Sequence, residues 1–127
     1  MSDSIFTKII KGEIPSNKVY EDDSVITILD VNPEAPGHLL VIPKKQTDKF
    51  YEMDNEDFSY LMAIAKTIAS ALAKASGMRT VLKIVGTDVP HVHVHLIPLR
   101  NAGTNKLSGL DKKEIVETIK KELENVN

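Results

Sequence analysis

The sequence predicts an α+β domain with about five strands, one long helix and a second helix near the C-terminus. Three observations predict it: short apolar segments separated by turn residues, one long segment with helical periodicity, and a final amphipathic segment. A chain of 127 residues has the usual size of one domain, and it buries roughly two-thirds of its unfolded surface. We therefore expect residues 1–127 to form a single domain.

The first half of the chain predicts a short helix followed by three strands. Apolar residues recur at helical spacing within Ser4–Lys11, and Gly12 and Pro15 end this segment. Three short apolar segments bounded by turn residues predict strands over residues 18–21, 25–30 and 38–43. Because the apolar run of the third strand is continuous, we expect that strand to be buried on both faces.

The second half predicts a long helix, two strands and a final helix, over residues 55–76, 80–85, 91–97 and about 111–125. In the long helix apolar residues recur every three or four positions, with Asp54 placed to cap its start and Gly77 its end. Asp111 and Glu114 have the spacing of a capping box at the start of the final helix.

Composition excludes several classes of function. The formal net charge is -2, so no basic excess is available for binding nucleic acid. There are no cysteines, which excludes disulfides, cysteine zinc sites and thiol catalysis. The N-terminal segment does not resemble a signal peptide, and no apolar stretch reaches the ~18 residues of a membrane span. We therefore expect a cytosolic protein without nucleic-acid or membrane partners.

Three of the four histidines fall within one alternating run, His91-Val92-His93-Val94-His95. On a strand, successive side chains point to opposite faces, so the valines would enter the core and the imidazoles would share the other face. Neighbouring imidazoles would then stand about 6.7 Å apart, which is two strand steps. Imidazole acts as a base, a nucleophile or a metal ligand near neutral pH.

The run by itself leaves three interpretations open. A metal would need close ligands, and because His91 and His95 lie roughly 13 Å apart on a regular strand, only a pair such as His93 and His95, with His38 as third ligand, fits one ion. The histidines would otherwise be satisfied surface residues on an exposed edge strand. In the third interpretation a neutral imidazole attacks phosphorus while its neighbours donate protons.

Three ordered motifs give the chain a family resemblance. The run His91–Ile97 has the pattern His-φ-His-φ-His-φ-φ, where φ is apolar, and it is preceded by characteristic segments at residues 5–15 and 30–44. Together they resemble the histidine triad (HIT) family of nucleotide hydrolases and transferases, in its Hint-like branch, over about residues 4–100. The resemblance implies the HIT-like fold, with an antiparallel sheet. It also implies a homodimer that pairs through the long helix and an adjoining strand.

The resemblance also implies catalytic roles for all four histidines. His93 would be the nucleophile that takes up the nucleoside monophosphate. His95 would contact the phosphate and assist departure of the leaving group. His91 and His38 would form a supporting hydrogen-bond chain, and the alternative for His38 is a buried, satisfied histidine.

A second set of residues is implied to bind the nucleoside. Asp30 would accept hydrogen bonds from the ribose hydroxyls, since an ionised carboxylate is an acceptor only. Phe6, Ile9, Ile28 and Val31 would wall the base pocket with apolar surface. Simpler interpretations stay open, because Asp30 also suits the cap of a loop and an apolar cluster near the N-terminus also suits a core.

The segment before the triad departs from the pattern of Hint-type relatives. Many of them have Gly, Gln and Ser at the positions that here hold Gly86, Thr87 and Asp88. Gly86 is retained, and the Thr87 hydroxyl can still donate one hydrogen bond to a phosphate. The carboxylate of Asp88 repels a phosphate, and we expect it to pair with a lysine or to hold a histidine.

The predicted function is hydrolysis of a small-molecule substrate, a purine nucleoside 5′-phosphoramidate or an acyl nucleotidate. Attack by His93 would give a covalent nucleotidyl-histidine, and water would then release the nucleoside monophosphate. This chemistry requires no cofactor and no obligatory metal. One alternative is a dinucleoside polyphosphate hydrolase, and another, of a different class, is a nucleotide-binding or scaffold protein with vestigial activity.

Overall fold

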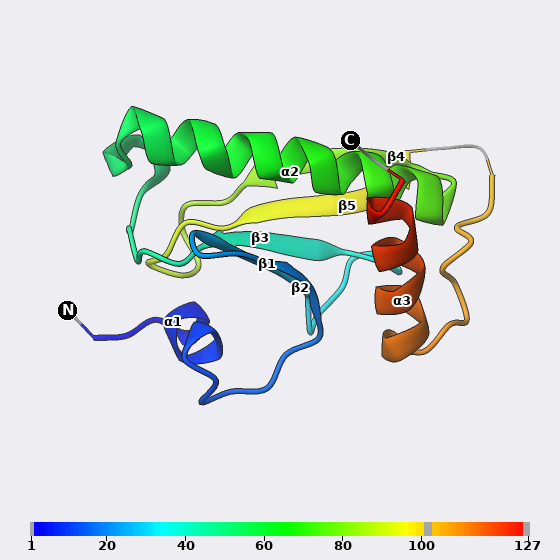
Figure 1. Ribbon diagram of the computed structural model, residues 1–127, viewed down its shortest axis with the longest axis horizontal. Helices are drawn as coiled ribbons and strands as arrows, with labels where there is room; N and C mark the ends of the chain where they lie inside the picture. The colour runs from blue at the N-terminus through cyan, green and yellow to red at the C-terminus, as the bar shows by residue number, and fades with distance from the viewer. Residues whose placement is uncertain (1, 101–102, 126–127) are drawn as a thin grey trace.

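The computed structural model describes residues 2–100 and 103–125 as one antiparallel sheet with helices on both faces (Figure 1). The five strands lie in the order β1-β2-β3-β5-β4, and every neighbouring pair is antiparallel, which confirms the predicted α+β class. The elements in chain order are α1 (Ile5–Ile10), β1 (Lys18–Glu21), β2 (Val25–Leu29), β3 (Leu39–Pro43), the 3-10 turn η1 (Phe50–Glu52), α2 (Asn55–Ser76), β4 (Arg79–Ile84), β5 (Val94–Arg100) and α3 (Lys112–Leu123).

The helix ends follow the sequence closely. Asp54 accepts a hydrogen bond from the backbone N–H of Asp57 at 2.8 Å, and Gly77 closes α2 in the left-handed conformation with φ 71°. Asp111 and Glu114 form the predicted capping box at the start of α3. Side-chain acceptors at these positions satisfy backbone donors that the first helical turn leaves unpaired, which fixes where each helix begins. Among the described residues, no helix combines the length and apolar character needed to cross a membrane.

Strand alternation divides the core into two layers. Leu39, Val41, Val94 and Leu96 face α2 and α3 and belong to the larger apolar cluster. The smaller cluster, on the other face of the sheet, combines residues of β2 and β3 with two from α1: Ile26, Ile28, Leu40, Ile42, Phe6 and Ile9. Figure 1 shows α2 above the sheet and α1 below it. The long helix therefore covers only one face of the sheet, and the other face, on the α1 side, is open to the histidines.

The fifth strand begins later than the sequence predicts. It starts at Val94 rather than at His91. The backbone N–H of His91 donates to Val89 at 2.8 Å and that of Val92 donates to Thr47 at 2.8 Å, so this segment leaves the sheet ladder before the strand begins. The alternation of side chains survives, since Val92 and Val94 join the larger apolar cluster. β5 is also an interior strand between β3 and β4, which contradicts the edge-strand interpretation of the histidines.

Gly37 is the tightest backbone position next to the site. Its φ is +93°, and a Cβ added there would lie 2.5 Å from Leu107 Cδ1 and 3.2 Å from Leu72 Cδ1. Both leucines are fully buried, so neither has room to withdraw. The glycine therefore permits both the turn and the close packing that present His38 to His95 of β5.

Replacing Gly37 by alanine should destabilise the protein more than the same change at Gly12. Gly12 also has positive φ, +82°, but a Cβ there would meet no atom within 4 Å. Gly12→Ala should cost about 1 kcal/mol of unfolding free energy for the backbone conformation alone, and Gly37→Ala about 1–3 kcal/mol more. Denaturant unfolding of the two variants measures this difference, and equal losses would show that packing at Gly37 contributes nothing.

Candidate active site

The three histidines of the run lie on the face of the sheet that carries α1. Val92 and Val94 pack into the larger apolar cluster on the opposite face. His91, His93 and His95 are 0%, 2% and 9% exposed, so the interpretation as surface histidines is wrong. Burying polar rings is favourable only where each ring nitrogen finds a partner or a function, so the partners of these nitrogens define what the site can do.

His91 is held from two sides. Its Nε2 lies 2.7 Å from the carbonyl oxygen of Pro43, and because a carbonyl only accepts, Nε2 carries the proton. Nδ1 is then an acceptor, and it receives the hydroxyl of Ser4 at 2.6 Å. Ser4 also accepts from the backbone N–H of Thr7 at 3.0 Å, where it caps α1. The first helix and the first histidine are thus joined through one hydroxyl.

His93 is oriented by the main chain. Its Nδ1 donates to the carbonyl oxygen of His91 at 2.8 Å, which leaves the lone pair of the neutral ring on Nε2. That nitrogen lies 3.6 Å from Oδ1 of Asp88, which is an ion pair only when the ring is protonated. The ring of Phe6 packs against the His93 ring with centroids 4.7 Å apart. His93 therefore presents an unshared electron pair on Nε2.

His95 has the opposite proton arrangement. The backbone N–H of Glu34 donates to Nδ1 of His38 at 3.0 Å, so the His38 proton is on Nε2. The Nε2–H of His38 donates to Nδ1 of His95 at 2.9 Å. The single proton of a neutral His95 is therefore on Nε2. His95 Nε2 is buried, and no described group accepts from it. A chain that starts at a backbone amide thus ends in an unused N–H donor.

The two results are complementary. Each of the four histidines contributes two ring nitrogens, and the described residues satisfy all of these except two. One is a free acceptor, Nε2 of His93, and the other is a free donor, Nε2 of His95. The two rings are neighbours, with centroids 5.0 Å apart. A nucleophile and a proton donor side by side are the two groups that displacement at phosphorus requires.

The protonation states follow from burial. Burial lowers the pKa of His91 and His38, although the Pro43 carbonyl acts against this at His91 and the Asp30 carboxylate acts against it at His38. Burial also lowers the pKa of His95, and the nearby rings of His93 and His38 add to the effect. Removing an imidazolium from water is costly, so these three rings are neutral at neutral pH and the tautomers above are the relevant ones.

Asp30 divides its two carboxylate oxygens between two tasks. Oδ1 accepts from the backbone N–H of Asn32 at 2.8 Å and so closes the loop that follows β2. Oδ2 lies 3.4 Å from Nε2 of His38 and 4.0 Å from Nδ1 of His95. The capping interpretation therefore holds for one oxygen, while the other lies against the histidine chain.

The structure separates the residues expected around the nucleoside. Phe6, Ile9 and Ile28 belong to one buried apolar cluster beside the histidines, whereas Val31 is 73% exposed in the loop after β2. Gly86, Thr87 and Asp88 are exposed in the connection between β4 and β5. Of these, Asp88 is the residue that reaches a histidine, so the expectation that it would hold one agrees with the structure.

Two sets of side chains come close enough to resemble a metal site: Asp30, His38 and His95, and Asp88, His93 and His95, each with ligand atoms within 4.8 Å of one another. A metal ligand needs a free lone pair. The Glu34 amide keeps the His38 proton on Nε2, and His38 in turn keeps the His95 proton on Nε2. Either set would have to invert this chain of hydrogen bonds before it could ligate an ion.

Several residues that hold the histidines in place were not predicted from the sequence. The Glu34 amide determines which nitrogen of His38 carries the proton, and the Ser4 hydroxyl satisfies the remaining nitrogen of His91. Gln46 fixes Ser4 in turn, because its Oε1 accepts from the Ser4 backbone N–H at 2.9 Å and from the Thr7 hydroxyl at 2.7 Å. The spacing Ser4-x-x-Thr7 marks a helix start, which is the one available signal for Ser4. A backbone donor such as Glu34 leaves no signal in the sequence.

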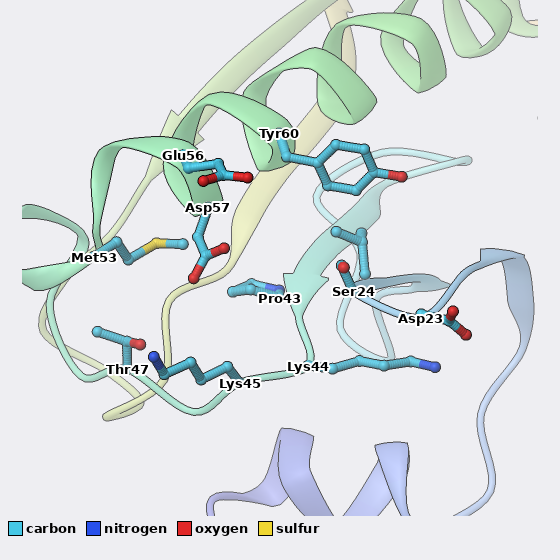
Figure 2. A pocket seen from close by; sticks show the side chains of 11 residues that line it. Asp23, Ser24, Pro43, Lys44, Lys45, Thr47, Met53, Glu56, Asp57 and Tyr60 are labelled. Atoms are coloured by element: carbon cyan, nitrogen blue, oxygen red, sulfur yellow. The ribbon is translucent and has the colours of Figure 1, made fainter.

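A cavity of about 440 Å³ lies away from this chemistry, beside the N-terminal end of α2 (Figure 2). Figure 2 shows Glu56, Asp57 and Tyr60 of α2 on one side of it and Lys45 and Thr47 on the other. None of the four histidines lines it. Pro43 borders both regions, since its carbonyl oxygen holds His91, but the reactive nitrogens lie outside this cavity.

The fold and the paired histidines define an α+β protein whose active-site candidate is an imidazole cluster. Residues 11–102 match the HIT domain, and the chain belongs to the HIT family. It is similar to adenosine 5′-monophosphoramidase HNT1 of Saccharomyces cerevisiae, with 39% identity over 112 residues, 87% of this chain and 71% of that protein. This relative and the family match support a hydrolase.

Solved structures agree with this family. A HIT-like protein from Bartonella henselae, described as involved in cell-cycle regulation, has a TM-score of 0.83 and 35% identity, and the match covers 94% of this chain and 96% of that one. A zinc-bound histidine triad family protein from Mycobacterium smegmatis has a TM-score of 0.82 and 31% identity, covering 95% of this chain and 93% of that one. The HIT-like fold predicted from the sequence is confirmed.

The proton arrangement can be read directly by nuclear magnetic resonance. Two-bond ¹H–¹⁵N correlation spectra, recorded where the rings are neutral, should show His93 with its proton on Nδ1, and His38, His91 and His95 with theirs on Nε2. The reason is that the carbonyls of Pro43 and His91 only accept and the Glu34 N–H only donates, so one tautomer of each ring fits its partners. A His93 ring protonated on Nε2 would contradict the assignment of its free electron pair.

Proposed function

We propose that the protein hydrolyses nucleoside 5′-phosphoramidates or acyl nucleotidates through a covalent intermediate on His93. The observation that carries the proposal is the pair of unused ring nitrogens, an acceptor on His93 beside a donor on His95. Nucleophilic attack needs the first, and departure of a basic leaving group needs the second. The similarity to a yeast adenosine 5′-monophosphoramidase supports the substrate class.

In the first step Nε2 of His93 attacks phosphorus, a P–N bond to the ring forms, and the bond to the leaving group breaks. The electron pair of the broken bond stays with the leaving nitrogen or oxygen, which accepts a hydrogen bond from the Nε2–H of His95 and takes its proton from water, leaving hydroxide. The His93 ring gains positive charge as it is nucleotidylated. The carbonyl of His91, which accepts from Nδ1 at 2.8 Å, stabilises that charge.

In the second step water attacks the same phosphorus and the bond to His93 breaks. The electron pair returns to Nε2 of His93, and the proton lost by the attacking water neutralises the hydroxide that the first step left. The products are a nucleoside monophosphate and the enzyme in its original proton arrangement. Neither step moves a proton into the chain of His38 and Glu34, so the arrangement survives each turnover.

Nucleoside binding would use the surroundings of the triad. Oδ2 of Asp30, which lies against the histidine chain, would accept from the ribose hydroxyls. Phe6, Ile9 and Ile28 would supply the apolar side of the base pocket, with the exposed Val31 closing over it. Apolar walls recognise a flat ring without reading its edge, and we propose purine nucleotides as the class to test first.

Hydrolysis of dinucleoside polyphosphates would use the same nucleophile and is the alternative activity. A nucleotide-binding or scaffold protein with vestigial activity is the alternative of another class. The oriented lone pair of His93 favours the enzyme over the binding protein, because binding a nucleotide does not require a nucleophile. The cytosolic location expected from the sequence stays a prediction.

Replacing His93 by alanine should lower kcat/KM for an adenosine phosphoramidate by roughly a thousandfold or more, because the attacking group is lost. His95→Ala should lower it by about a hundredfold or more, because the hydrogen bond to the leaving group is lost while the nucleophile stays. Mass spectrometry of base-quenched reactions should find one nucleotide adduct on the wild-type chain. Retained turnover in His93→Ala would contradict the proposal, as would AMP binding by the wild type without turnover of a phosphoramidate or a diadenosine polyphosphate.

We further propose a homodimer that pairs through α2 and the outer edge of β4. β4 is an edge strand of the described sheet, and Leu82 on it is 40% exposed. An unpaired edge strand with an exposed apolar side chain is a ready template for pairing with a second copy. Leu82→Arg should convert the dimer to a monomer in light scattering at unchanged far-ultraviolet circular dichroism, and a wild-type chain that is already monomeric would contradict the proposal.

A further inference from the structure

Among residues 2–100 and 103–125, Asp88 is the charged residue that lies against the reactive nitrogen of His93. Its Oδ1 lies 3.6 Å from His93 Nε2. The same oxygen accepts from the backbone N–H of Val89 at 3.0 Å, so the loop itself fixes the carboxylate. The side chain is 52% exposed, and it therefore faces both the solvent and the approach to the nucleophile.

The surrounding charges are predominantly negative. Asp30, Glu34 and Asp88 all lie close enough to act on the histidines. The nearby cation is Lys83, whose Nζ pairs with the Glu34 carboxylate at 3.2 Å and is thereby neutralised in part. A substrate phosphate brings further negative charge to this region. The charge of the leaving group therefore determines whether the electrostatic repulsion between the bound substrate and these carboxylates increases or decreases.

We infer that Asp88 selects substrates by the charge of the leaving group, favouring amines that carry or acquire positive charge over anionic polyphosphates. This inference rests on the proposed function and names the substrate class within it. An ammonium beside the reacting phosphorus would be attracted by the Asp88 carboxylate. A leaving ADP would bring additional phosphate charges into its field and would be repelled.

The reaction step itself generates the favoured charge. Attack by His93 forms the P–Nε2 bond and breaks the P–N bond to the amine, and the electron pair stays on the amine nitrogen. That nitrogen accepts a hydrogen bond from the Nε2–H of His95, and two protons from water make it an alkylammonium ion. Asp88 stabilises the ammonium as it forms, whereas a departing ADP becomes more negative as its bond to phosphorus breaks.

Three substrates separate charge from every other property. Adenosine 5′-phosphoramidates of ethylenediamine and of propylamine have the same length, and they differ in an ammonium for a methyl group. Diadenosine triphosphate supplies the anionic leaving group. The kcat/KM of each is measured for the wild type, for Asp88→Asn, which keeps the shape, and for Asp88→Ser, which also opens space.

Asp88→Asn should lower kcat/KM for the ethylenediamine compound about tenfold and for the propylamine compound about threefold or less, and raise it for diadenosine triphosphate about tenfold. Asp88→Ser should shift the three values in the same directions. Because the carboxylate is half exposed, high salt should shrink the wild-type preference between the two amines.

Glu117→Gln is the matched control. Glu117 is exposed on α3, which covers the opposite face of the sheet, and its replacement removes one surface carboxylate without changing the site. All three kcat/KM values should stay within about twofold of the wild type. A Glu117→Gln shift as large as that of Asp88→Asn would overturn the inference, because net charge alone would then explain the preference.

The wild-type measurement distinguishes failure of the inference from failure of the proposed function. If the wild type turns over the propylamine compound but Asp88→Asn changes all three substrates by the same factor, Asp88 only positions His93 and the inference is wrong. If the wild type turns over none of the three while its circular dichroism shows a folded chain, the proposed function fails and the inference falls with it. Opposite shifts for cationic and anionic leaving groups support both.

Discussion

Three main-chain groups govern the positions of the protons in the histidine cluster. The carbonyls of Pro43 and His91 each accept one ring N–H, and the amide of Glu34 donates to one ring nitrogen. A carbonyl cannot donate and an amide cannot accept, so these contacts fix tautomers as no side-chain contact between two histidines does. The backbone therefore sets the tautomer of His93 directly, through the His91 carbonyl. His38 passes the effect of the Glu34 amide on to His95.

Packing makes that arrangement durable. The helices α2 and α3 occupy one face of the sheet, and the α1 face keeps a smaller apolar cluster in which the imidazoles are buried. Burial lowers the pKa of His38, His91 and His95, so the rings stay neutral and the chain of donors and acceptors stays intact. The same layer supplies Phe6, whose ring packs against both His91 and His93.

The sequence predicted the elements well because periodicity and caps are local. Asp54, Gly77 and Asp111 mark helix ends through their own side chains or backbone freedom, and the structure places those ends as expected. The triad was visible because its alternation is local too. The start of β5 was missed, since it depends on a hydrogen bond from Val92 to the distant Thr47. The Glu34 amide was invisible for the same reason, because a loop conformation sets it opposite His38.

Ser4 shows how one atom can belong to two systems at once. Its hydroxyl oxygen accepts from the amide of Thr7, while its proton is given to His91. Fraying of the first helical turn and loosening of a buried imidazole are therefore a single event. The segment around Ser4, remote in sequence from the triad, therefore anchors the His91 ring, and its detachment would free that ring to move beside the nucleophile.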